Sequence, residues 1–109
     1  MPTLVIARLH DVRMGPEIAT YLATVDATLP AYGGRFLVHG GRYDRIEGDW
    51  TGDLVIVQFP DRESADGWYA SAPYREILPL RTGNALCDVI MVDTVPPDYR
   101  AASLLKPPA

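Results

Sequence analysis

Residues 61–81, DRESADGWYASAPYREILPLR, contain the densest group of side chains in the chain that could hold a small ligand. Aromatic rings offer flat apolar surface with a polar tip, and a guanidinium can bind a carboxylate through two parallel hydrogen bonds. These residue types predict binding of a small aromatic or carboxylate-bearing molecule. The residues expected to line the site are Trp68, Tyr69, Tyr74 and Arg81, with Arg35 and Trp50 from earlier in the chain.

A structural role is the alternative for the same side chains, and the sequence leaves both possibilities open. Trp68 would then belong to the core, and Tyr74 would donate a hydrogen bond to a backbone carbonyl. Arg81 would pair with Glu76 or Asp88 and so tie a helix to the sheet.

Two further residues are weak candidates for proton transfer. His39 belongs to the residue type that titrates nearest neutral pH, and it stands beside Gly40-Gly41, where a backbone can approach a ligand. Glu47 could act as an acid or a base. The alternatives are a half-exposed strand histidine and an ion pair between Glu47 and Arg42 or Arg45. Two histidines and one cysteine without metal-ligand spacing predict neither a metal site nor a cofactor.

Two short helices with a corner between them are expected to position the ligand-binding group. Asp61 is a suitable N-cap for the first helix, and Ser71 for the second. Pro73 fits the first turn of the second helix, and Pro79 with Gly83 is expected to end it. Helical spacing gives one apolar face with Ala65, Trp68, Tyr69 and Ala72, and another with Tyr74, Ile77, Leu78 and Arg81.

The rest of the chain predicts a sheet covered by helices on one face. Residues 3–10, 35–40, 53–59 and 84–93 read as strands, and residues 14–32 as an amphipathic helix with Tyr21 in the core. Residues 42–52 read as a polar hairpin excursion. Because the strands are apolar on both alternating faces and helices cover only one, we expect a second copy to cover the other. The sequence therefore predicts a homodimer.

The stretch WYASAPYREILPLR resembles the signature of the DUF1330 family of small uncharacterised proteins. Two other motifs of that family occur in the same order, Tyr32-Gly33-Gly34-Arg35 and Glu47-Gly48-Asp49-Trp50, and the resemblance spans residues 3–93. It implies a ferredoxin-like β-α-β-β-α-β protomer, an α+β fold with a four-stranded antiparallel sheet that assembles as a dimeric α+β barrel. It implies no agreed activity. We expect one domain over residues 1–94 and a Pro-rich tail over 95–109, which is either loose or docked on a neighbour through Leu104 and Leu105.

Composition narrows the classes of partner. The net charge of -4 disfavours nucleic acid and anionic membranes, because neutralising phosphates requires a basic face. No apolar run approaches the ~20 residues of a membrane span, and no signal peptide is evident. The single cysteine, Cys87, favours a reduced, cytoplasmic setting.

Two functions remain: a small-molecule-binding dimer, or a cofactor-independent enzyme of the oxygenase or isomerase type. The second is favoured only by analogy with similar barrels.

Overall fold

The computed structural model describes residues 1–105 of the chain. Its elements follow the expected β-α-β-β-α-β order, with the second helical unit divided into two helices. They are β1 (Thr3–His10), α1 (Pro16–Thr24), β2 (Arg35–His39), β3 (Asp53–Phe59), α2 (Arg62–Ala70), α3 (Ala72–Thr82) and β4 (Leu86–Asp93), with short 3₁₀ turns at Val25–Thr28, Pro30–Tyr32 and Ala101–Leu105. The fold is α+β and ferredoxin-like, as predicted.

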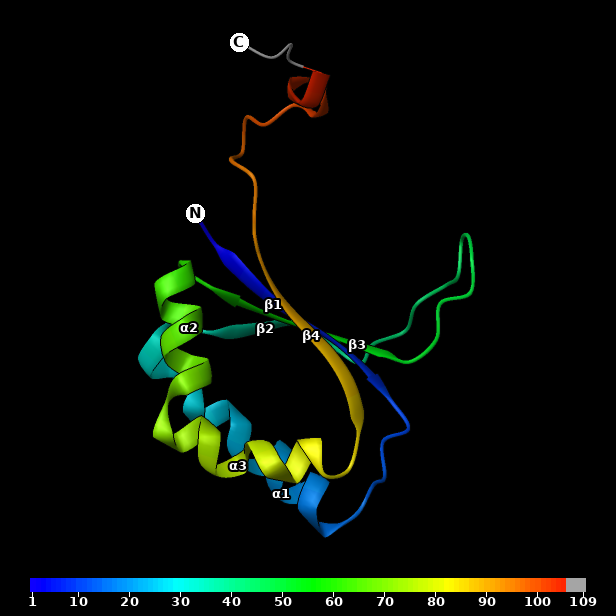
Figure 1. Ribbon diagram of the computed structural model, residues 1–109, viewed down its shortest axis with the longest axis vertical. Coiled ribbons are helices and arrows are strands. Elements are labelled where there is room, and N and C mark those ends of the chain that lie inside the picture. Colours follow the sequence, from blue (N-terminus) through cyan, green and yellow to red (C-terminus); the bar gives the residue numbers. More distant parts are fainter. Residues whose placement is uncertain (106–109) are drawn as a thin grey trace.

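The four strands form one antiparallel sheet in the order β2-β3-β1-β4. Successive residues of a strand point to opposite faces, so the pairing register assigns each side chain to a face. Val5 lies opposite Val57 and Met91 on the face that the helices cover. Ile6 lies opposite Ile56 and Ile90 on the other face. Figure 1 shows α1, α2 and α3 together on one side of the sheet.

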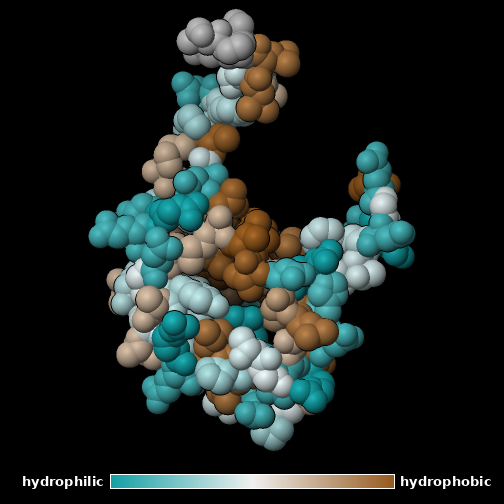
Figure 2. Space-filling view, viewed as in Figure 1, coloured by the Kyte–Doolittle hydropathy of each residue, from teal (hydrophilic) through white to brown (hydrophobic). Residues whose placement is uncertain are grey.

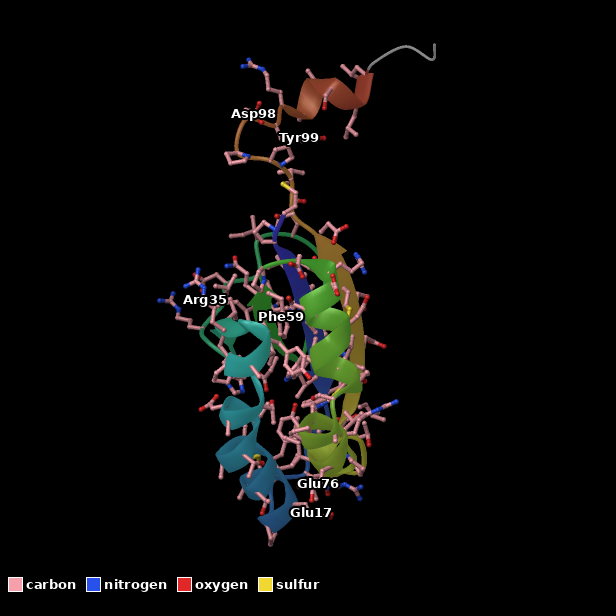
Figure 3. The ribbon with its side chains drawn as sticks, turned by 90° about the vertical axis from the view of Figure 1, so that its left-hand side faces the viewer. Glu17, Arg35, Phe59, Glu76, Asp98 and Tyr99 are labelled. Carbon is pink, nitrogen blue, oxygen red and sulfur yellow. The ribbon has the colours of Figure 1, made fainter. Side chains whose placement is uncertain are left out.

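The core lies between this covered face and the helices. Phe59 is fully buried, and Trp68 and Tyr74 are almost so. Gly34 makes the packing around Phe59 possible, because a Cβ on that residue would lie 2.6 Å from the Phe59 ring. Trp68 of α2 and Tyr74 of α3 belong to the same core cluster as Phe59 of β3, and Figure 3 shows Phe59 in the interior beside α2.

Several predicted boundaries were wrong. The helix expected over residues 14–32 is α-helical only from Pro16 to Thr24 and continues as two 3₁₀ turns. Hydroxyls compete for its carbonyls there: Thr24 bonds back to the carbonyl of Thr20, and Thr28 to that of Val25. Pro79 does not end α3 but lies within it, and Gly83 is its C-cap. Strand β2 ends at His39 and β4 begins at Leu86.

Two segments project from the sheet on the side away from the helices: the connection between β2 and β3 (residues 40–52) and the C-terminal segment after β4 (Figure 1). Figure 2 shows hydrophobic side chains gathered over the sheet between these projections. Leu104 and Leu105 at the end of the described segment are largely exposed. The docking of this tail on a neighbour remains a prediction, and its last four residues, 106–109, lie outside the described part.

Candidate functional site

A cavity of about 690 Å³ lies between the covered face of the sheet and the helices. Sheet residues form one wall and the apolar side of α1 forms the opposite one. The apolar wall residues include Val5, Ala7, Val55 and Val57 from the strands and Ile18 and Leu22 from α1. Its volume falls within the range of about 300–1,000 Å³ that is usual for sites holding small molecules.

The corner between α2 and α3 positions the aromatic end of the cavity. The Asp61 carboxylate accepts a hydrogen bond from the Ser64 backbone N–H at 2.8 Å and so begins α2. The Ser71 hydroxyl donates to the Trp68 carbonyl at 2.7 Å and accepts from the Tyr74 backbone N–H at 3.4 Å. Both predicted caps are therefore confirmed. Ser71 joins the end of one helix to the start of the next, which brings the Trp68 and Tyr74 rings to a centroid distance of 4.0 Å.

Trp68 serves both the core and the cavity wall. Its indole N–H donates to the Thr28 hydroxyl at 2.9 Å, and its ring packs on Phe59 at a centroid distance of 5.3 Å. These contacts fix the ring, so the part of Trp68 that faces the cavity is a rigid apolar surface. Tyr69 lines the same end of the cavity, 5.5 Å from the Tyr74 ring.

A polar group closes the buried end of the cavity. The Tyr21 and Tyr74 hydroxyls lie 2.8 Å apart, and Arg81 donates to the Tyr74 hydroxyl through a longer contact of 3.4 Å. Burial above all, and then the nearby Tyr74, raise the pKa of Tyr21 far above its ordinary value, so its hydroxyl stays protonated. Burial works to lower the pKa of Arg81, but the Tyr74 and Tyr21 oxygens outweigh it and raise that pKa. The site therefore holds a permanent positive charge.

Arg81 does not form the ion pair that one interpretation of the sequence proposed. Asp88 lies on the other face of the sheet and pairs there with Arg8 at 3.6 Å. Glu76 is exposed in the middle of α3 (Figure 3). Within residues 1–105, Arg81 has no salt-bridge partner, although only 7% of its surface is exposed. Tyr74 likewise bonds to side chains at its hydroxyl rather than to a backbone carbonyl.

The exposed rim of the cavity carries the titratable groups. His39 lines the cavity from the end of β2, with its ring stacked on Phe36 at 4.5 Å. His10, Asp11 and Asp53 lie on the same rim. Glu47 is exposed in the projecting segment and is not part of the lining. Its proposed partner Arg42 pairs instead with Asp44 at 3.2 Å.

Arg35 and Trp50 lie outside the cavity. Arg35 is exposed, stands opposite Gln58 in the register and points away from the helices in Figure 3. The Trp50 ring lies 5.5 Å from the guanidinium of Arg8, whose ion pair with Asp88 is on the open face of the sheet. The structure thus brings together Trp68, Tyr69, Tyr74, Arg81 and His39, and separates Arg35, Glu47 and Trp50 from them.

The family model for DUF1330, a domain of unknown function, matches residues 2–95. The chain belongs to this family. No curated protein is similar enough to the chain to match it. Within residues 1–105, no helix is long and apolar enough to cross a membrane, and no group of three or more His, Cys, Asp or Glu residues is arranged to hold a metal ion.

Solved structures with the same fold are distant in sequence. A protein of unknown function from Rhodopseudomonas palustris is 20% identical, with a TM-score of 0.66 over 88% of this chain and 84% of its own. A dimeric ferredoxin-like protein of unknown function from Jannaschia sp. CCS1 is 11% identical, with a TM-score of 0.66 over 86% and 100%. SnoaB, a cofactor-independent oxygenase from Streptomyces nogalater, is 13% identical, with a TM-score of 0.60 over 91% and 98%. These likenesses show the fold alone.

Tyr21 is a polar residue at the buried end of the cavity in this DUF1330 protein that the sequence did not assign to the site. It packs against the core as predicted, but its hydroxyl also completes the polar end of the cavity. Tyr21 and Tyr74 are 53 residues apart in the chain, and each falls on an apolar helical face. Their spacing contains no signal for the hydrogen bond between them. The one available clue was that a tyrosine placed in a core needs a partner for its hydroxyl.

Proposed function

We propose that this DUF1330 protein is a homodimer that binds a small aromatic or carboxylate-bearing molecule in the cavity between its sheet and its helices. The observation that carries the proposal is the cavity itself, about 690 Å³ with apolar walls and a few convergent polar groups at one end. Trp68, Tyr69, Tyr74 and Arg81 are the proposed ligand contacts, since they line that end.

The open face of the sheet supports the dimer. Ile90 and Val92 on this face are 57% and 40% exposed, and Ile6 and Ile56 continue the row of Ile90 across the sheet. A contiguous apolar surface of this kind is unfavourable in water and favours association. A second copy offers a matching surface, and the structurally similar protein from Jannaschia sp. CCS1 is described as dimeric.

Filling the cavity tests the binding site. Ala7 lines the cavity from a central strand, and Ala7→Phe would place a ring in the space meant for the ligand. We expect the variant to remain dimeric by native mass spectrometry but to lose binding of 2-naphthoate, followed by its fluorescence. Ala23→Phe on the exposed side of α1 is the matched control and should bind like the wild type. Unchanged binding by Ala7→Phe would place the ligand elsewhere.

A cofactor-independent enzyme is the second candidate function. It is favoured by one feature of the site: His39, whose imidazole has one nitrogen that can accept a proton and one that can donate it, lines the same cavity as Trp68 and Tyr74. The similar fold of an oxygenase adds only analogy. The test is to incubate the protein and a His39→Gln variant with molecules extracted from the purified dimer. Turnover by the wild type alone would favour the enzyme, and unchanged molecules would favour the binding protein.

A further inference from the structure

The buried end of the cavity has an unusual balance of charge. Arg81 carries a full positive charge with only 7% of its surface exposed. A buried charge is costly unless an opposite charge or several hydrogen bonds compensate it. The groups that act on the Arg81 guanidinium are Tyr74, Tyr21 and Cys87, none of which is a carboxylate. The carboxylates that line the cavity, Asp11 and Asp53, belong to its exposed rim.

The hydrogen bonds at this end of the cavity leave a hydrogen-bond donor available, and they supply no negative charge. A guanidinium only donates, and Arg81 already donates to the Tyr74 oxygen. The Tyr21 and Tyr74 hydroxyls have two hydrogens between them, and their mutual bond of 2.8 Å uses only one. Whichever hydroxyl donates in that bond, the other hydrogen remains available to a third group. Arg81 also donates to the Tyr74 oxygen, so that oxygen already accepts one hydrogen bond from the protein.

From this geometry we infer that Tyr21, Tyr74 and Arg81 form an oxyanion subsite, and that the ligand enters with a carboxylate or an ionised ring hydroxyl directed at the tyrosine pair. This deepens the proposed function and rests on it. The apolar walls hold the body of the ligand, while the spare hydroxyl hydrogen and the guanidinium charge meet its anionic oxygen. The anion supplies the charge that Arg81 lacks within the described protein. Tyr21 is thereby assigned a ligand-positioning role.

Two probes of nearly the same shape test this inference on the full-length protein. 2-Naphthoate carries an anionic head group, and 2-naphthamide replaces it with a neutral amide that donates as well as accepts. Because charge-assisted hydrogen bonds are about twice as strong as neutral ones, we expect 2-naphthoate to bind about tenfold more tightly or better. Arg81→Met should remove this preference, and Tyr21→Phe should reduce it. Arg45→Met is the control: it removes an exposed arginine that does not line this cavity and should leave the preference unchanged.

Stability separates a ligand-binding role from a structural one. If Arg81 serves the ligand, removing an uncompensated buried charge should leave the thermal midpoint of the empty protein unchanged or higher. If Arg81 instead holds the fold, Arg81→Met should lower the thermal midpoint. Tyr21→Phe keeps the charge and the ring, so in that case it should bind 2-naphthoate in preference to 2-naphthamide as the wild type does. These two results together would overturn the inference. Equal binding of the two probes by the wild type would also overturn it but leave the proposed function standing. Binding of neither probe would refute both.

Discussion

The two faces of the sheet have similar apolar side chains but different surroundings. On the covered face, Val5 and Val57 are buried beneath the helices and border a cavity with a polar end. On the open face, Ile90 and Val92 are exposed next to each other, and the Arg8–Asp88 pair separates them from the exposed Leu86. The covered face therefore combines a cavity with directional hydrogen bonds, whereas the open face is mainly an exposed apolar surface.

This difference assigns a separate role to each face. A ligand site requires a hollow and fixed polar groups, and the covered face provides both in its cavity of about 690 Å³ with the Tyr21–Tyr74 pair at one end. A second hollow of about 420 Å³ lies beside the open face and is lined largely by the segment between β2 and β3, including Glu47 and Trp50. A protein interface requires exposed apolar area, which the open face provides between its two projecting segments (Figure 2). Substitutions on the covered face should thus affect folding or binding, and those on the open face should affect assembly.

The two tryptophans provide the largest expected contrast. Trp68→Ala removes a buried ring and the hydrogen bond that its indole N–H donates to Thr28, so we expect a loss of about 3–5 kcal/mol in the free energy of unfolding. Trp50→Ala removes a partly exposed ring near the open face and should cost about 1 kcal/mol or less. Chemical denaturation at one protein concentration measures both. Comparable losses would show that the open side contributes to the fold as much as the core does.

A charge on the open face should separate the protomers. Ile90→Asp would bury a carboxylate at the proposed interface without an opposite charge. We therefore expect the dissociation constant of the dimer to rise at least about 30-fold. Light scattering across a dilution series should detect monomers, while the circular dichroism spectrum stays that of the folded protein. Ala23→Asp on the exposed side of α1 is the control. If Ile90→Asp stays as dimeric as this control, the open face is not the interface.

Removing the Tyr74 hydroxyl should have a smaller effect on the covered face. Tyr74→Phe keeps the ring against Trp68 but deletes the bonds to Tyr21 and Arg81, which should cost about 1–2 kcal/mol of stability. Affinity for 2-naphthoate should fall about tenfold, while the dimer persists. Denaturation, titration and native mass spectrometry follow the three quantities. A weakened dimer would mean that the two faces are coupled rather than independent.

Much of the fold could be predicted because its signals are local. Short runs that are apolar on both faces define the strands, and Asp61 and Ser71 mark the helix starts that the structure shows. Pro79 misled the sequence interpretation, since a proline near the end of a helix can be accommodated without ending it. The length of α1 was overestimated because the 3₁₀ turns after Thr24 keep apolar residues on nearly the same side as the helix.

The site was harder to predict because it depends on contacts between distant segments. Trp68, Tyr69, Tyr74 and Arg81 share one stretch, so the sequence could group them. Arg35 and Trp50 carry suitable side chains and belong to motifs of the family, but neither lines the cavity. Sequence motifs identify residue types but not the face of the sheet on which a side chain lies. The pleat of the sheet decides the face for Arg35, and the path of residues 40–52 decides it for Trp50.

The smallest expected effect concerns the helix that covers the cavity end. Hydrogen bonds from the Ser64 backbone N–H and then its side chain hold the pKa of the exposed Asp61 carboxyl below its usual range. A lowered folded-state pKa means that the carboxylate stabilises the protein above its unfolded pKa of about 3.9 and loses that effect as the pH falls through the folded value. Asp61→Asn keeps a capping oxygen but removes the charge. Its thermal midpoint should lie slightly below that of the wild type at neutral pH, and the difference should vanish in acid. Glu63→Gln, in the first turn rather than at the cap, is the control; an equal pH-dependent difference there would assign the effect to general helix electrostatics instead of the cap.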